Sequence, residues 1–323
     1  MTNALPADFL RLSARLGQNP LLVLGPGGNT SLKRDGLLWI KASGTELAQA
    51  ETRDIFVPVH LQAARAEARG AGDGTCLAAI ADLAITLRPS IETTFHALIE
   101  WPVVAHFHSV AAIVHGISPE GRAEARRKLA GLPFDSIPYR KPGRPLTLRI
   151  GETLNRDTQV WLLENHGIIC AGESVAAVQS LIDEVERQLA MPVLVTATEP
   201  HALPPEDLEW LEGTSVLARD DRLRAIAMAG SLYPDHVVFL GSGLPQFEPG
   251  QRRPAAIVAG QGVVVPHSAT SAQRAMARCL ADVLARVPTG WRLDMLFPED
   301  EAELLNWDAE KYRQALAAQK ATA

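Results

Sequence analysis

The stretch "VVAHFHSV", residues 103–110, places two histidines one position apart in a run of otherwise mostly apolar residues. Successive side chains of a β-strand point to opposite faces, so residues two positions apart share a face. The run therefore predicts a buried strand in which His106 and His108 present two imidazoles side by side. Zinc needs three or four ligands, usually brought together from different elements, so this pair calls for further ligands elsewhere in the chain.

A third candidate ligand and a carboxylate stand on either side of this stretch. His166 closes the apolar segment "WLLENH", and Gly167 after it allows a backbone or a ligand to approach closely. Glu92 lies one helical turn before His96, so the two side chains can face the same way. The sequence thus predicts a metal site of three histidines with the carboxylate of Glu92 nearby.

Two glycine-rich loops precede these residues. "GPGGNTSLK", residues 25–33, is followed by a strand and has no Gly-Lys-Ser/Thr ending, so it is neither a P-loop nor a dinucleotide fingerprint. Small residues let backbone N–H groups converge on an anion, and Asn29 adds a side-chain donor. "KASGTEL", residues 41–47, is a second loop of this kind, with Lys41 as a counter-charge. Both loops predict an anion-binding role.

Composition sets the limits of the prediction. The chain has 323 residues, 47% of them apolar, and a formal net charge of −6, which is ordinary for a soluble protein. We expect no membrane partner, because no run approaches the roughly 18 apolar residues of a membrane helix, and no nucleic-acid partner, because the balance is acidic. The N-terminus does not resemble a signal peptide, and three dispersed cysteines favour a reducing cytoplasm.

Periodicity and turn residues predict a mixed α and β organisation, with a proline-rich linker over 191–207. We expect a first domain over 1–200 and an α+β extension over 201–323. The predicted helices cover 7–17, 75–89, 91–101, 120–131, 174–190, 271–287 and 300–319. The predicted strands cover 21–24, 31–33, 37–41, 103–110, the part of 159–172 that runs into His166, 236–241, and a hairpin within 255–266.

Five motifs in this order resemble the class II aldolase/adducin family over residues 5–195. They are Gly28-Asn29-x-Ser31, Ser43-Gly44, Ser90-x-Glu92-x-x-x-His96, His106-x-His108 and Asn165-His166-Gly167. "WIKASGTEL" and the long C-terminal part look most like the aldolase half of bifunctional rhamnulose-phosphate aldolases. The resemblance implies a three-layer α/β/α sandwich around a mostly antiparallel sheet, which usually assembles as a homotetramer.

The resemblance also implies roles for single residues. Zinc, with Mn²⁺ or Co²⁺ as alternatives, would bind His106, His108 and His166, and Glu92 would be the catalytic acid/base. The phosphate of the substrate would bind Gly28, Asn29, Ser43, Gly44 and Ser90. Fuculose-phosphate aldolases have two serines before this glutamate, whereas the second position here is Ile91, so one phosphate donor is missing.

These roles predict a metal-dependent lyase of carbohydrate metabolism that cleaves a small phosphorylated hydroxyketone through a metal-stabilised enediolate. A sugar-phosphate 4-epimerase and an oxo-acid phosphate decarboxylase would share the same intermediate, so both stay open. A non-catalytic assembly module, like the head domain of adducin, is the alternative from another class. The extension is expected to provide packing or oligomer contacts, or a lid from which His236 or Tyr312 reaches the metal.

Overall fold

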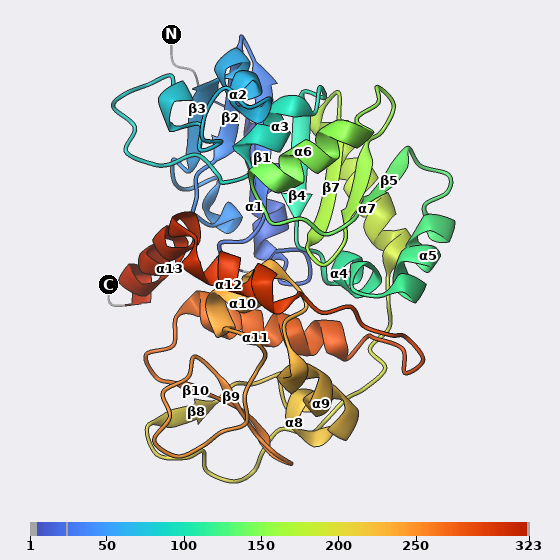
Figure 1. The fold of residues 1–323 in the computed structure, drawn as a ribbon, viewed down its shortest axis with the longest axis vertical. Helices are drawn as coiled ribbons and strands as arrows, with labels where there is room; N and C mark the ends of the chain where they lie inside the picture. The colour runs from blue at the N-terminus through green and yellow to red at the C-terminus, as the bar shows by residue number, and fades with distance from the viewer. Residues whose placement is uncertain (1–4, 24, 322–323) are drawn as a thin grey trace.

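The computed structural model describes residues 5–23 and 25–321. A seven-stranded sheet forms the upper half of the molecule, and a part built around a three-stranded sheet lies below it (Figure 1). The strand order is β3-β2-β1-β4-β7-β6-β5, and only the β5–β6 pair is parallel. The bounds are β1 Asn29–Arg34, β2 Leu37–Lys41, β3 Phe56–His60, β4 Val103–Phe107, β5 Phe134–Ile137, β6 Val160–Leu163 and β7 Gly167–Gly172. The predicted mostly antiparallel central sheet is confirmed.

Helices cover both faces of this sheet, as the alternation along β4 requires. Val103, Ala105 and Phe107 pack toward one helical layer, whereas Val104 packs toward the other. The first layer is formed by α1 Ala7–Gln18, α4 Val110–Gly116, α5 Pro119–Lys128 and α7 Val175–Leu189. The second layer is formed by α2 Leu61–Ala68, α3 Thr93–Leu98 and α6 Arg144–Thr153. The three-layer α/β/α sandwich is therefore confirmed, with β4 near its centre.

Two predicted elements of this part are wrong. The expected helix over 75–89 is only a short 3-10 turn, Leu77–Ala79, in an otherwise irregular segment. The Asp82 carboxylate accepts a hydrogen bond from the backbone of Ala84, a local bond that competes with helix formation, and Ile80 bridges to Val59 of β3. The expected strand over 21–24 is a turn up to residue 23, and Leu24 lies outside the described residues.

The C-terminal part is an α+β extension, as predicted. Its strands are β8 Leu208–Trp210, β9 Ala256–Val258 and β10 Gly262–Pro266, and the last two form the expected hairpin. Its helices are α8 Val216–Arg219, α9 Asp221–Ala229, α10 Pro234–Leu240, α11 Ser271–Leu284, α12 Pro298–Asn306 and α13 Asp308–Ala321. The predicted strand over 236–241 is wrong, because this segment is helix α10. Pro234 starts that helix, and burial of all its residues removes the periodicity that distinguishes a helix from a buried strand.

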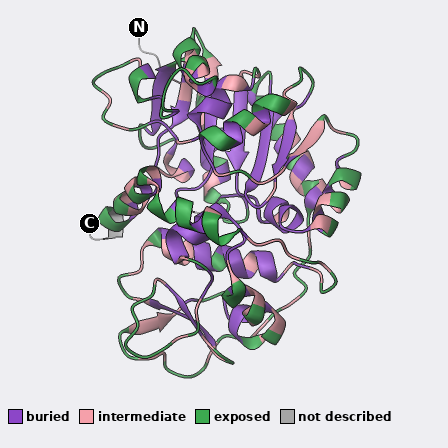
Figure 2. Cartoon of the chain, viewed as in Figure 1, coloured by how far each residue is buried: buried purple, intermediate pink, exposed green. Residues whose placement is uncertain are grey.

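The extension shares a hydrophobic core with the first part. Ile113 and Val114 on α4 pack in one buried cluster with Leu280 of α11 and Leu304 of α12. Figure 2 shows this burial continuing from the sheet into the extension. Among the described residues, no helix is long and apolar enough to cross a membrane.

Candidate metal centre

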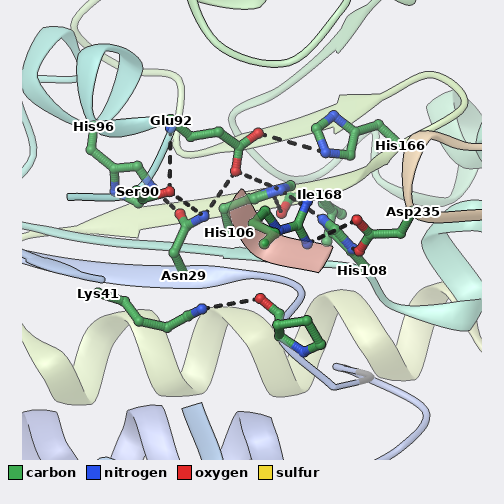
Figure 3. Close-up of polar contacts among 12 residues, drawn as sticks. Asn29, Lys41, Ser90, Glu92, His96, His106, His108, His166, Ile168 and Asp235 are labelled. Atoms are coloured by element: carbon green, nitrogen blue, oxygen red, sulfur yellow. Dashed lines mark hydrogen bonds and ion pairs between the residues drawn. The ribbon is translucent and has the colours of Figure 1, made fainter. Parts of the chain in front are cut away.

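Two histidines lie at the C-terminal end of β4, His106 within the strand and His108 directly after its last residue, and their ring nitrogens approach each other. His106 is fully buried, and its Nδ1 lies 3.1 Å from the carbonyl oxygen of Ile168 on the neighbouring strand β7. A bond to this carbonyl fixes the proton on Nδ1 and turns Nε2 outward with its lone pair. That Nε2 lies 3.0 Å from Nε2 of His108, so the two atoms can face one ion (Figure 3).

The third histidine comes from the turn that joins β6 to β7. Asn165 adopts a left-handed conformation there (φ 53°), and its side-chain amide donates to the carbonyl oxygens of Leu232 and Asp294 in the extension. A Cβ on Gly167 would lie 2.6 Å from the carbonyl oxygen of Phe107, so only glycine allows this approach of β7 to β4. The predicted buried strand that runs into His166 is β6, and a tight turn between β6 and β7 aims His166 at β4.

The three histidines fit a divalent metal. One ring nitrogen from each lies within 4.8 Å of the others, and zinc–nitrogen bonds of about 2.0–2.1 Å would separate tetrahedral ligand atoms by about 3.3 Å. Burial lowers the pKa of His106 to about 4 and places the pKa of His166 well below its usual range. Both rings are therefore neutral, which is the state that binds metals. The Nδ1 atom of His166 is buried and has no hydrogen-bond partner among the described residues.

Glu92 lies against this cluster from the side of α3. Its Oε2 is 3.4 Å from Nε2 of His106, and its Oε1 is 3.6 Å from Nε2 of His166. The side chain is only 4% exposed, and Oε1 forms no hydrogen bond with any residue that the structure describes. A buried carboxylate oxygen without a donor is costly unless a cation or a ligand occupies the adjacent space.

A chain of hydrogen bonds holds Glu92 in place. The amide of Asn29 donates to Oε2 of Glu92 at 2.8 Å and to Oγ of Ser90 at 3.2 Å. The Oδ1 atom of Asn29 accepts from Nε2 of His96, and Nδ1 of His96 lies 2.7 Å from the hydroxyl of Ser31. His96 therefore orients Asn29, and Asn29 orients Glu92 (Figure 3).

The extension supplies three charged side chains that the sequence analysis missed. The Oδ2 atom of Asp235 on α10 lies 2.9 Å from Nδ1 of His108, and its Oδ1 accepts from Nη2 of Arg313 on α13 at 2.9 Å. Glu310 accepts from Nη1 of the same arginine at 2.8 and 3.0 Å. Burial opposes ionisation of Asp235, but Arg313 and His108 outweigh it and keep its pKa below the ordinary value.

The sequence carries little signal for these contacts. An aspartate in the first turn of a helix is common because of the helix dipole, so Asp235 looks ordinary. The spacing of Glu310 and Arg313 indicates a helical ion pair but no place near a metal. His236, one of the two predicted lid residues, is buried in α10 and does not line the cavity beside the three histidines. Tyr312, the other predicted lid residue, lines a second cavity next to it.

The two glycine-rich loops lie beside the metal cluster. Gly28 has a φ of 62°, and a Cβ there would lie 2.9 Å from the carbonyl oxygen of His106. The ammonium group of Lys41 donates to the carbonyl oxygens of Pro26 and Thr45 and so ties the loops together. A cavity of about 30 Å³, here called the inner cavity, is enclosed by the predicted site residues and the extension. Its lining includes Gly28, Asn29, Lys41, Ser43, Gly44, Ser90, Glu92, His108, His166, Asp235, Glu310 and Arg313.

Comparison with known proteins identifies the family. Residues 8–193 match the model of the class II aldolase and adducin N-terminal domain, which is more than half of the chain, and the chain belongs to this family. An uncharacterized oxidoreductase, YuxG of Bacillus subtilis, is 28% identical over 183 residues. That match covers 50% of this chain but only 26% of YuxG, so the chain spans about a quarter of that relative.

A solved structure shows the same fold over the first part of the chain. The N-terminal class II aldolase domain of a Thermoplasma acidophilum protein superposes with a TM-score of 0.50 at 24% identity, covering 58% of this chain and 93% of that domain. An L-fuculose-1-phosphate aldolase from Thermus thermophilus has a TM-score of 0.39 at 17% identity, covering 57% of this chain and 92% of the other.

Proposed function

We propose that the protein is a metal-dependent lyase that cleaves a small hydroxyketone with an anionic group, in the manner of class II aldolases. The observation that carries this proposal is the buried cluster of His106, His108 and His166 with Glu92 beside it. Zinc, or Mn²⁺ or Co²⁺ in its place, would act there as a Lewis acid for negative charge that develops on substrate oxygens. An assembly module of the adducin kind has no need of these four residues, which favours the enzyme.

Glu92 is proposed as the group that moves a proton at the carbon next to the substrate carbonyl. Its unpartnered Oε1 lies beside the ligand nitrogens, where a substrate bound at the cluster would meet it. Asn29 and His96 keep the carboxylate aimed at this position. Asp235 is proposed to hold the ring of His108 and to raise its basicity as a ligand.

The remaining parts of the proposal rest on the sequence. The substrate is a sugar phosphate and the protein is a homotetramer, as the family resemblance implies. The three dispersed cysteines are the basis for a cytoplasmic location, and the proline-rich segment 191–207 is the basis for a first domain that ends near residue 200. Gly28, Asn29, Ser43, Gly44 and Ser90 are the family positions for phosphate binding and stay a prediction. Epimerisation and decarboxylation of related phosphates use the same kind of intermediate, so they are alternative outcomes of the test below.

The test begins with metal content. Protein dialysed against zinc and then against metal-free buffer should retain close to one equivalent, and His166→Ala should retain far less. The loaded protein is then incubated in deuterium oxide with ketose 1-phosphates, pentulose 5-phosphates and oxo-tetronate phosphates, and products are identified by mass. Aldehyde formation supports the lyase, whereas a deuterated epimer or loss of carbon dioxide identifies an alternative. A wild-type chain that retains no divalent metal would contradict the proposal.

A further inference from the structure

The inner cavity is closed by the last helix of the chain. A volume of about 30 Å³ has room for about one water molecule and cannot hold a sugar phosphate. Leu316 of α13 lies directly against Gly44, since a Cβ built on this glycine would collide with Cδ1 of Leu316. With α13 in this position, the space above the Ser43–Gly44 loop is occupied by a leucine side chain.

Polar groups of the inner cavity are also already engaged. Both hydrogens of the Asn29 amide are directed at protein acceptors, Ser90 and Glu92. The ammonium group of Lys41 is held by two backbone carbonyls, and position 91 carries isoleucine. An anion seated here would have to replace these bonds, and it would lie next to the carboxylates of Glu92, Asp235 and Glu310.

A second cavity adjoins the first. This outer cavity has a volume of about 280 Å³ and shares the lining residues Ser43, Ile91 and Pro142 with the inner cavity. Trp307 and Tyr312, from the α12–α13 segment, line it as well. Its volume is close to the lower end of the range for small-molecule sites and is enough for a chain of several carbons.

Cationic groups gather in the outer cavity. Arg88 and Arg144 line it together with the carboxylate of Asp73, and neither arginine forms an ion pair with a carboxylate that the structure describes. The guanidinium of Arg88 lies 4.3 Å from the ring centroid of Tyr312, which holds it over the cavity. Lys141 is also present but is paired with Glu303 at 3.3 Å. Two arginines without carboxylate partners beside a metal site fit an anionic ligand better than a neutral one.

The N-terminal end of α6 also lies at the outer cavity. Gly143 is the N-cap of this ten-residue helix, and no side chain caps it. Gly143, Arg144 and Pro145 all line the outer cavity. The positive end of the helix dipole therefore adds to the charge of the two arginines.

We propose that the outer cavity binds the anionic end of the substrate, through Arg88 and Arg144, while the other end is held at the metal centre. The inference rests on the proposed metal-dependent function and narrows its substrate class. It selects linear hydroxyketones or oxo acids whose phosphate or carboxylate is several carbons from the chelating oxygens. A phosphate only one or two carbons away would instead have to occupy the inner cavity.

Binding of hydroxamates to the zinc-loaded protein tests this arrangement, because a hydroxamate chelates the metal without reacting. Compounds with a two-carbon or a five-carbon chain, each ending in phosphate, carboxylate or hydroxyl, are compared by calorimetry. We expect the phosphate or carboxylate to strengthen binding of the long compound about 10- to 100-fold over its hydroxyl analogue, and the short compound much less. Whichever of phosphate and carboxylate strengthens binding more identifies the anionic group of the substrate.

Variants then locate the anion. The double variant Arg88→Gln/Arg144→Gln should lose the gain and still bind the hydroxyl-terminated compound like the wild type. The matched control, Arg126→Gln/Arg156→Gln, removes the same charge from exposed arginines outside both cavities and should retain the gain. The inference is overturned if the anionic group strengthens binding most in the short compound. It is also overturned if Ser90→Ala abolishes the strengthening by the anionic group and the arginine double variant does not. If no hydroxamate binds, including those ending in hydroxyl, the metal-dependent function itself is refuted.

Discussion

Asp235→Asn changes the charge next to His108, a proposed metal ligand, with almost no change of shape. The carboxylate is 3% exposed and lies between Nδ1 of His108 and the guanidinium of Arg313, 2.9 Å from each. Asparagine can still accept one hydrogen bond from His108, but it accepts as a neutral group. Arg313 keeps Glu310 as a charged partner, so the substitution does not leave a buried cation alone.

The size of the effect follows from these contacts. A hydrogen bond to a charged group contributes about 1.5–3 kcal/mol, whereas a neutral bond contributes about 0.5–1.5 kcal/mol. The difference of about 1–1.5 kcal/mol corresponds to roughly tenfold weaker zinc binding for Asp235→Asn. Asp235→Ala removes the acceptor altogether. Loss of a group that holds a ligand histidine typically weakens metal binding by about 10- to 100-fold, and we expect Asp235→Ala to approach the larger value.

Competition with a chromophoric chelator measures the zinc affinity of each variant. Asp282→Asn is the matched control, because Asp282 also pairs with an arginine of the extension, Arg286, at 2.7 Å, but lies away from the cavity. We expect the control to bind zinc like the wild type. If Asp235→Asn and Asp235→Ala both keep wild-type affinity, or if the control loses as much, then Asp235 does not support the ligand.

Three further predictions concern single side chains. His106→Ala, His108→Ala and His166→Ala should each lose metal with the fold largely retained, and an unchanged metal content would show that the residue is not a ligand. Glu92→Gln should keep zinc but lose turnover and solvent deuterium exchange by about 10²–10⁴-fold, and wild-type exchange would place the base elsewhere. Burial raises the pKa of Glu186 to about 7. Between about pH 4.5 and pH 7 this carboxyl ionises more readily in the unfolded chain, so it increasingly destabilises the folded protein as the pH rises. Glu186→Gln should therefore raise the melting temperature at pH 8 and not at pH 4, and equal shifts at both would contradict that cause.

Local sequence patterns were enough for the elements that carry the histidines. The mostly apolar run around His106 predicted a buried strand, and β4 occupies residues 103–107 of it. The two loops and the three histidines are each marked by residue types with a recognisable chemistry, such as Gly28 and His166. Each of these signals consists of residues within a few positions of one another, so each motif could be recognised without knowledge of tertiary contacts.

The failures arose where tertiary contacts decide the outcome. Residues 236–241 read as a strand because valine and phenylalanine favour strands, yet packing on all sides stabilises the helix that Pro234 begins. Asp235 and Arg313 are ordinary charged helix residues until the fold brings α10 and α13 to β4. A sequence separation of 127 positions between His108 and Asp235 leaves no local pattern that could reveal their contact.

The charges around the inner cavity explain why the extension belongs to the site. Glu92, Asp235 and Glu310 face it against two cations, Lys41 and Arg313, so the lining carries one net negative charge when all five are ionised. A divalent ion bound by the three histidines would reverse this to one net positive charge. The net negative lining favours the binding of a cation, and the net positive charge with the ion bound would stabilise negative charge that the proposed carbon–carbon cleavage leaves on the substrate. Without the extension, two carboxylates and one arginine would be missing, and the cavity would lose the negative charge that offsets the metal.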